Sequence, residues 1–225
     1  MVAKIAVIMA SFNRPKYISA SIQSVLDQTF KDWKLYIMDN SSPNLWPTMQ
    51  QIYSQYIDER IVVDHTEITN KDRPWKPLTM VANKGLFTLS EKEPYVILGV
   101  DDNVMMPNKL EILSGFLDTH PEASMVSGAL ELMKPDGSVA AAWGGVDLAC
   151  TAGRLHWQQS MYRRELLEKA GIPTNDDPQP PDYLLSLRVA LLTERCYGIP
   201  IVLDRSSTLT YGLYQHWTAS VEAMA

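Results

Sequence analysis

Apolar residues follow two different spacings along the first half of the chain. Short continuous apolar runs, such as residues 95–98, are typical of buried strands, because a strand covered on both faces needs no polar side. Between them, positions such as Ile18, Ile22 and Val25 have the spacing of a helix with one buried face. This alternation is typical of an α/β fold with a mostly parallel, Rossmann-like central sheet flanked by helices. The predicted strands are residues 5–9, 33–38, 60–64, 95–98 and 124–128, and the predicted helices begin at Pro15 and Pro107 and cover 46–56 and 78–89.

The spacing changes after about residue 128. Lys134-Pro135-Asp136-Gly137-Ser138 predicts a turn between two extended segments, most simply a hairpin. Residues 139–145 show only weak periodicity. Since there is no repeat, low-complexity tract or linker, we expect one domain, 1–225, with a first half at 1–130 and a smaller mixed region at 131–225. The later predicted elements are helices at 160–170 and 183–192, a loop at 174–181 and a strand at 199–203.

Composition and charge narrow the classes of function. Hydrophobic residues make up 46% and charged residues 20% of the 225 residues, as in ordinary globular proteins. The net charge of −6 argues against a general affinity for nucleic acid, whose backbone requires a basic surface. The apolar part of residues 1–9 is too short for a signal peptide, and no apolar stretch has the length needed to cross a bilayer. We therefore expect a cytoplasmic protein without a membrane span.

Polar side chains follow three of the predicted strands. Ser11 and Asn13 come after the first strand, Asp39 after the second, and Asp101 and Asp102 after the fourth. The carboxyl ends of parallel strands share one edge of a sheet, so these groups should converge there. Two adjacent carboxylates are costly to place together unless a cation or sugar hydroxyls lie between them. The pattern favours a metal–nucleotide site, although turn chemistry at Asp39 and helix capping by Ser11 and Asn13 are the alternatives.

These segments resemble family 2 glycosyltransferases of the GT-A fold, which move a sugar from a nucleoside diphosphate to an acceptor. The likeness lies in Ile8-Met9-Ala10-Ser11-Phe12-Asn13-Arg14, in Ser24-Val25-Leu26-Asp27-Gln28-Thr29-Phe30 with Ile37-Met38-Asp39-Asn40-Ser41-Ser42, and in Asp101-Asp102-Asn103. It is strong over residues 3–130 and thinner to about 190. The Asp-Asp-Asn variant is similar to the spore-coat polysaccharide type. The common family pattern is Asp-x-Asp, and its first acidic position falls on Val100 here.

The resemblance implies roles for individual residues in the first half, which would be the nucleotide-sugar-binding half. Asp39 would accept a hydrogen bond from the N3–H of uracil or thymine, and Arg73 would lie near the base or the diphosphate. Asp101 would hold the ribose, and Asp102 would bind Mg²⁺ or Mn²⁺ bridging the two phosphates. Asn83 matches a further family position, and Ser11 and Asn13 complete the expected nucleotide site.

The second half would bind the acceptor. Pro181-Asp182-Tyr183 resembles the family's acidic residue at a helix N-terminus, where Asp182 would be the catalytic base; a helix N-cap is the alternative. His156 and Trp157 would lie on the acceptor side, and His216 would contact the metal or a phosphate. Packed or surface side chains are the alternative for these three. His65 and His120 are predicted to be surface residues.

The resulting prediction is metal-dependent, inverting, non-processive transfer of a sugar from a UDP- or TDP-sugar donor to the hydroxyl of an unknown glycan or small-molecule acceptor. A processive synthase would carry a Gln-x-x-Arg-Trp motif and membrane helices, which this sequence lacks. A nucleotidyltransferase would be expected to carry a glycine-rich loop after the first strand, and Ser11–Arg14 contains no glycine. A non-catalytic sugar-nucleotide or glycan-binding protein remains the other alternative.

Overall fold

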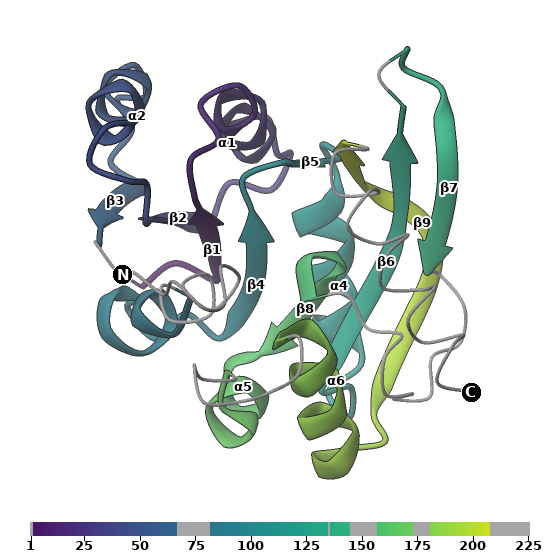
Figure 1. The fold of residues 1–225 in the computed structure, drawn as a ribbon. Coiled ribbons are helices and arrows are strands. Elements are labelled where there is room, and N and C mark those ends of the chain that lie inside the picture. Colours follow the sequence, from purple (N-terminus) through teal and green to yellow (C-terminus); the bar gives the residue numbers. More distant parts are fainter. Residues whose placement is uncertain (1, 67–81, 135, 145–156, 173–180, 208–225) are drawn as a thin grey trace, which may run out of the picture.

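The structure is a computed structural model that describes residues 2–66, 82–134, 136–144, 157–172 and 181–207. Its centre is one nine-stranded sheet with the order β3-β2-β1-β4-β8-β6-β9-β5, in which β7 pairs with β6 outside this path. Helices cover both faces (Figure 1). In the part of the chain that is described, no helix has the length and apolar character needed to cross a membrane.

The first half forms the parallel part of the sheet. Adjacent strands of the series β3-β2-β1-β4 run parallel, so their carboxyl ends lie at one edge. The half-exposed pattern of β3 agrees with its place at the margin of the sheet. The elements are β1 (Ile5–Ser11), α1 (Ile18–Leu26), β2 (Trp33–Asp39), α2 (Trp46–Tyr53), β3 (Ile61–His65), η1 (Gly85–Leu89), β4 (Tyr95–Val100), β5 (Asn103–Met105), α4 (Lys109–Thr119) and β6 (Met125–Met133).

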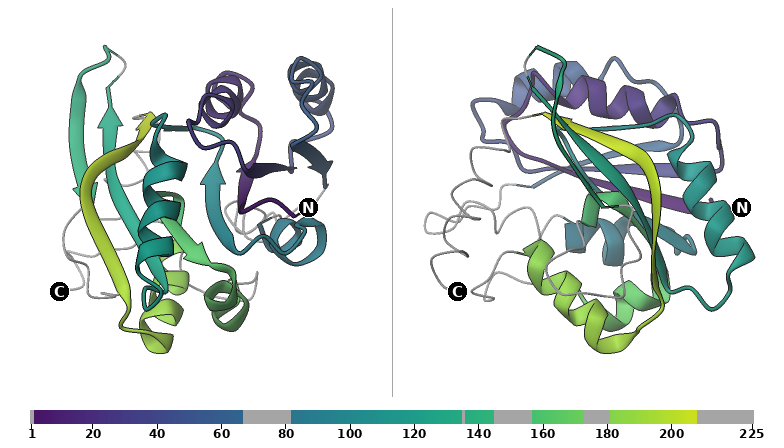
Figure 2. Two further views of the ribbon diagram at one scale, coloured as in Figure 1. Left: turned by 180° about the vertical axis from the view of Figure 1, so that it is seen from behind. Right: turned by 90° about the vertical axis from the view of Figure 1, so that its right-hand side faces the viewer.

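The second half extends the sheet with strands of both directions. β8 is antiparallel to β4 and β6, whereas β9 is parallel to β6 and antiparallel to β5. Figure 2 shows β9 following β6 along the side of the sheet that carries the β6–β7 hairpin. The elements are β7 (Val139–Gly144), η2 (Trp157–Gln159), β8 (Ser160–Arg163), α5 (Arg164–Ala170), α6 (Pro181–Leu192) and β9 (Cys196–Ser207).

Alternate side chains of β1 enter two different cores. Ile5, Val7 and Met9 pack with the apolar faces of α1, α2 and α4, and all three are at most 1% exposed. Ala6 and Ile8 point to the opposite face, where η1, α5 and α6 pack. A strand buried on both faces has no polar alternation, which is why its sequence is a continuous apolar run.

Four differences separate the observed elements from the predicted ones. Residues 160–163, predicted as the start of a helix, form β8, because their backbone completes the sheet between β4 and β6. The predicted strand at 199–203 is part of the longer β9, and β5 was not predicted. The predicted helix at 78–89 ends in the π-helical turn η1, and its first residues lie outside the described part of the chain.

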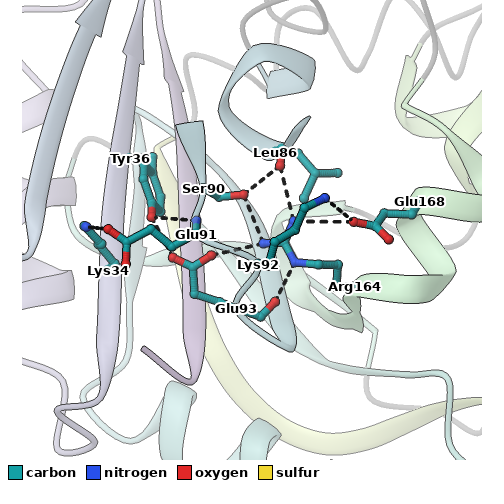
Figure 3. A network of polar contacts seen from close by, with 9 residues as sticks. All are labelled: Lys34, Tyr36, Leu86, Ser90, Glu91, Lys92, Glu93, Arg164 and Glu168. Carbon is teal, nitrogen blue, oxygen red and sulfur yellow. Dashed lines mark hydrogen bonds and ion pairs between the residues drawn. The ribbon is translucent and has the colours of Figure 1, made fainter. Parts of the chain in front are cut away.

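A buried polar network joins the two halves at the amino end of β4. Glu93 is fully buried and accepts hydrogen bonds from the Tyr36 hydroxyl of β2 at 2.6 Å and from Nη2 of Arg164 of α5 at 3.1 Å (Figure 3). Arg164 also donates to the Glu93 carbonyl at 2.6 Å and to the Ser90 hydroxyl at 3.0 Å. A buried charge is tolerated when it is paired and hydrogen-bonded. This network therefore fixes α5 against the parallel strands.

Candidate functional site

The three polar loops at the carboxyl edge meet through direct hydrogen bonds, as the parallel topology predicted. The backbone N–H of Phe12 donates to Oδ2 of Asp101 at 2.9 Å. The N–H of Asn13 donates to the Ser41 hydroxyl at 3.0 Å, and Oδ1 of Asn13 accepts from the N–H of Ser42 at 2.9 Å. Asn13 has φ 55°, a left-handed conformation that asparagine tolerates better than most residues. Its side chain therefore joins the first two loops and does not cap α1.

Asp101 and Asp102 lie in the tight connection between β4 and β5, and both are almost completely buried. Burial raises the pKa of Asp101 to about 7, against the opposing effects of the Arg14 guanidinium and the Phe12 N–H. Oδ2 of Asp102 accepts a close contact from Nη1 of Arg14, and the same nitrogen lies 3.8 Å from Oδ1 of Asp101. One cation thus faces both carboxylates.

Asp39 ends β2 with its side chain fully buried. Its oxygens accept hydrogen bonds from the N–H of Ser41 at 2.7 Å, from the Ser41 hydroxyl at 3.1 Å and from the Tyr53 hydroxyl at 2.7 Å. Burial, followed by the charge of Asp39, raises the pKa of Tyr53 above its ordinary value. Tyr53 therefore stays a hydrogen-bond donor that orients the carboxylate.

His65 was predicted to be a surface residue, and this prediction is wrong. Its ring stacks on Trp46 with ring centroids 3.8 Å apart, and Nε2 lies 2.9 Å from the Ser41 carbonyl and 3.8 Å from Oδ1 of Asp39. The side chain is 14% exposed, because α2 places Trp46 over the end of β3. His120 also differs from its prediction, since it is half-buried and stacks on Phe116.

A recess of about 180 Å³ opens beside Asp102. Tyr17 and Ser21 line it from the α1 side, and Arg205 and Ser206 line it from β9. The Ser206 hydroxyl also donates to the Asp102 carbonyl at 3.4 Å. The recess therefore lies between α1 and β9, with Asp102 in its lining.

A fully buried ion pair binds Asn103, the residue that follows the acidic motif Asp101-Asp102. Nζ of Lys109 lies 2.6 Å from Oδ1 of Asp204, and neither side chain is exposed. The same oxygen accepts from Nδ2 of Asn103, the residue after Asp102, at 2.7 Å, while Lys109 donates also to the Gln158 carbonyl. Burial lowers the pKa of Lys109 and raises that of Asp204, and the attraction within the pair opposes both shifts.

The carboxylates fit a divalent metal ion that shares its coordination with a ligand. Mg²⁺ is usually held by one or two carboxylates together with substrate phosphates, not by a cage made only of protein atoms. Asp102 offers such a carboxylate next to the recess. Among the described residues there is no cluster of three or more His, Cys, Asp or Glu that could hold a metal ion.

The other predicted site residues either belong to segments other than the three loops or fall outside the described part of the chain. The side chain of Asn83 donates to the Ile172 carbonyl at 3.3 Å. This hydrogen bond links the residues just before η1 to those just after α5, and not to the three loops. Asp182 is the second residue of α6, which places it in the first turn of a helix, and Trp157 begins η2. Arg73, His156 and His216 lie outside the described residues.

Sequence reasoning missed Arg14, Tyr53 and the Lys109–Asp204 pair. Arg14 ends the motif of residues 8–14, and its pairing with two converging carboxylates is a contact that a cation there is expected to make. Tyr53 was predicted as part of an amphipathic helix, and its hydroxyl gives no pattern of its own. Lys109 lies at the start of a helix where lysine normally reaches solvent, so nothing local indicates its burial.

The fold is shared with solved glycosyltransferase structures. S. aureus TarS 1–349 in complex with UDP superposes with a TM-score of 0.67 at 18% identity, covering 91% of this chain and 60% of that one. The mannosyltransferase PcManGT from Pyrobaculum calidifontis, in complex with GDP-Man and Mn²⁺, gives a TM-score of 0.64 at 15% identity, covering 92% and 57%. The architecture is the GT-A fold.

Sequence relatives match the first half. Protein CgeD of Bacillus subtilis (strain 168) and the putative glycosyltransferase EpsE of the same organism are each 28% identical over 123 residues, which is 55% of this chain. These matches cover 28% of CgeD and 41% of EpsE, so the chain spans less than half the length of these relatives. The model of the family described as glycosyl transferase family 2 matches residues 6–132, more than half of the chain. This chain therefore belongs to glycosyl transferase family 2.

Proposed function

We propose that the chain transfers one sugar per reaction from a UDP- or TDP-sugar to an acceptor hydroxyl, with a divalent metal ion and with inversion at the anomeric carbon. The observation that carries this proposal is the meeting of three loops around Asp101 and Asp102 at the carboxyl edge of the parallel strands. In open α/β sheets, ligands bind at this edge. Membership of glycosyl transferase family 2 supports sugar transfer as the reaction.

Base recognition is assigned to Asp39. Its oxygens accept three hydrogen bonds from Ser41 and Tyr53, and a carboxylate has about four acceptor positions. The remaining acceptor position is proposed to take the N3–H of uracil or thymine, a donor that cytosine lacks. Ser11 and Asn13 are proposed to complete the nucleotide site, and Arg73 and Asn83 are proposed to act along the base or the diphosphate. TarS has been solved with UDP and with UDP-GlcNAc, which supports a uracil nucleotide, while the GDP-Man complex of PcManGT makes GDP the competitor to test.

The metal ion is assigned to Asp102, Asp101 is assigned to the ribose, and His216 is assigned to a further contact with the metal or a phosphate. When bound, a Mg²⁺ or Mn²⁺ ion would neutralise charge on the departing diphosphate. The Mn²⁺ in the PcManGT complex supports a metal ion of this kind. The Phe12 N–H orients the Asp101 carboxylate, and the Ser206 hydroxyl of β9 binds the backbone carbonyl of Asp102.

The transfer step is assigned to Asp182 at the start of α6. The positive end of a helix keeps a carboxylate ionised, which suits a general base. Asp182 takes the proton of the acceptor hydroxyl while that oxygen bonds to the anomeric carbon and the bond from this carbon to the diphosphate oxygen breaks. One such displacement inverts the anomeric centre. His156 and Trp157 are proposed to contact the acceptor.

Thermal unfolding with nucleotides tests the proposal. UDP, TDP, GDP, CMP and ATP are each added with and without Mn²⁺ to the wild-type chain and to Asp102→Asn. A ligand at a hundred times its dissociation constant adds about 2.7 kcal/mol of stability, which a melting curve resolves readily. We expect stabilisation by UDP or TDP that requires Mn²⁺ and disappears in Asp102→Asn.

The matched control is Asp27→Asn, the same chemical change at the exposed end of α1. It should keep the full response to nucleotide. Stabilisation by GDP or ATP alone would contradict the role of Asp39, and stabilisation that persists without Mn²⁺ would contradict metal dependence. Release of free UDP or TDP from a sugar donor, lost in Asp182→Asn, then tests the catalytic base.

A further inference from the structure

The Arg14 guanidinium contacts the Asp102 carboxylate, to which the proposed metal ion is assigned. Its Nη1 contacts Oδ2 of Asp102 directly and lies 3.8 Å from Oδ1 of Asp101. The two carboxylate side chains are 6% and 5% exposed, so bulk water solvates a negative charge on either of them poorly. Among the described residues, Arg14 is a cation that lies against both carboxylates, and it compensates their charge in a site with little solvent.

A guanidinium and a divalent ion exclude one another at this oxygen. A Mg²⁺ or Mn²⁺ ion bonds to a carboxylate oxygen at about 2.0–2.2 Å and would bring two positive charges next to the positive charge of Arg14. At such separations, like charges repel strongly in a site with little solvent. Binding of the metal ion at Oδ2 of Asp102 therefore requires the Arg14 side chain to leave.

The structure allows Arg14 to leave without moving its loop. The Arg14 side chain is 35% exposed, far more than either aspartate. Its backbone is fixed, because its carbonyl accepts hydrogen bonds from the N–H groups of Tyr17 and Ile18, and Asn13 is tied to Ser42. A long side chain on a fixed backbone can change partners by rotating about its own bonds.

We propose that Arg14 is an internal counter-ion of the acidic motif, which competes with the metal ion for Asp102 and is released to the diphosphate when the nucleotide binds. The inference rests on the proposed function. Phosphate oxygens are good bidentate partners for a guanidinium, so a bound diphosphate gives Arg14 a new partner as it loses Asp102. Metal ion and nucleoside diphosphate then bind with positive coupling, because the metal ion displaces Arg14 from Asp102 and the diphosphate binds the displaced guanidinium.

Titration of Mn²⁺ into metal-free protein, followed by calorimetry or by the electron paramagnetic resonance of free Mn²⁺, tests this competition without any turnover. Arg14→Gln removes the charge and keeps a polar side chain. We expect it to bind Mn²⁺ alone about tenfold more tightly than the wild type. We also expect UDP to tighten Mn²⁺ binding by a larger factor in the wild type than in Arg14→Gln.

Two further variants make the result specific. Arg195→Gln removes the same charge from an exposed position before β9, so it controls for net charge and should match the wild type. Arg14→Lys keeps a cation beside Asp102 and should keep most of the competition. Circular dichroism and melting curves verify that each variant is folded.

Mn²⁺ binding that is unchanged or weaker in Arg14→Gln would overturn the inference. If the wild type binds Mn²⁺ with UDP while Arg14→Gln shows no gain for Mn²⁺ alone, the proposed function stands and only the role of Arg14 fails. If neither protein binds Mn²⁺ with or without UDP, both the metal dependence and the inference fail.

Discussion

Lys109 and Asp204 form an ion pair from which solvent is completely excluded, 2.6 Å apart, directly below the acidic motif. Oδ1 of Asp204 is shared between Lys109 and Asn103, while Oδ2 of Asp204 and Oδ1 of Asn103 have no hydrogen-bond partner among the described residues. One carboxylate oxygen thus joins α4, β5 and β9 at the point where Asp102 leaves the sheet.

Removal of one partner of this pair should destabilise the protein strongly. Lys109→Met leaves the Asp204 charge buried and uncompensated, for which we expect a loss of about 3–5 kcal/mol of unfolding free energy. Adding Asp204→Asn to Lys109→Met should recover part of that loss, since no charge then remains buried. Urea unfolding measures both, and the exposed pair Lys92–Glu168 supplies the control, because Lys92→Met should cost less than about 1 kcal/mol. Equal losses at Lys109 and Lys92 would contradict this account.

The network around Glu93 should behave in the same way at the opposite edge of the sheet. Glu93→Gln keeps the shape of the side chain but removes the charge that faces Arg164 in the interior. We expect a loss of about 2–3 kcal/mol in urea unfolding, because a hydrogen bond between charged groups is worth more than a neutral one. Glu122→Gln, at an exposed position, should change stability by less than about 0.5 kcal/mol. A Glu93→Gln variant as stable as the wild type would show that the network adds no stability.

Tyr53 should give the protein a distinctive response to high pH. The folded state raises the pKa of its hydroxyl, first through burial and then through Asp39, so the proton is held more tightly in the folded chain than in the unfolded one. The stability that Tyr53 contributes is therefore complete below about pH 10 and is lost progressively above it. We expect Tyr53→Phe to cost about 1 kcal/mol at pH 8 and less than that near pH 11, as measured by chemical unfolding.

Tyr56→Phe is the control for Tyr53→Phe. It removes a hydroxyl that donates to the Ser19 carbonyl at 3.2 Å and has no carboxylate partner in the described structure. Tyr56→Phe therefore measures the cost of losing a hydroxyl hydrogen bond to a carbonyl. A constant difference between the wild type and Tyr53→Phe from pH 8 to 11 would show that the folded state does not raise the pKa of the Tyr53 hydroxyl.

The parallel half of the fold was predictable because its physical cause is local. Strands such as β1 and β4 are buried on both faces, so burial appears directly as continuous apolar runs. Once these strands are parallel, their carboxyl ends must share an edge, and the meeting of Asn13, Asp39 and Asp101 follows from topology. The roles assigned to these residues remain predictions.

The mixed half was harder to predict because distant pairing determines its structure. Tyr162 lies four residues before Leu166, a spacing compatible with a helix, yet Met161 and Tyr162 form β8 because β4 and β6 pair with them on both sides. In β9, Gly198 and Pro200 interrupt a strand-like pattern, and the register of β6 against β9 shifts there, from Ser127 opposite Gly198 to Ala129 opposite Val202. An irregularity that accommodates proline hides one long strand from any local pattern.

The distance along the chain between β5 and β9 has a consequence for the order in which the site can form. Asn103 and Asp204 are 101 residues apart in sequence, yet they share a hydrogen bond beneath the acidic motif. Contacts between such distant residues form late in folding, because the intervening chain must be ordered first. On a ribosome, the loops after β1, β2 and β4 emerge well before the strand that supports Asp102. A fragment limited to residues 6–132, the part that the family model matches, contains every proposed nucleotide contact of the first half and lacks the support beneath them.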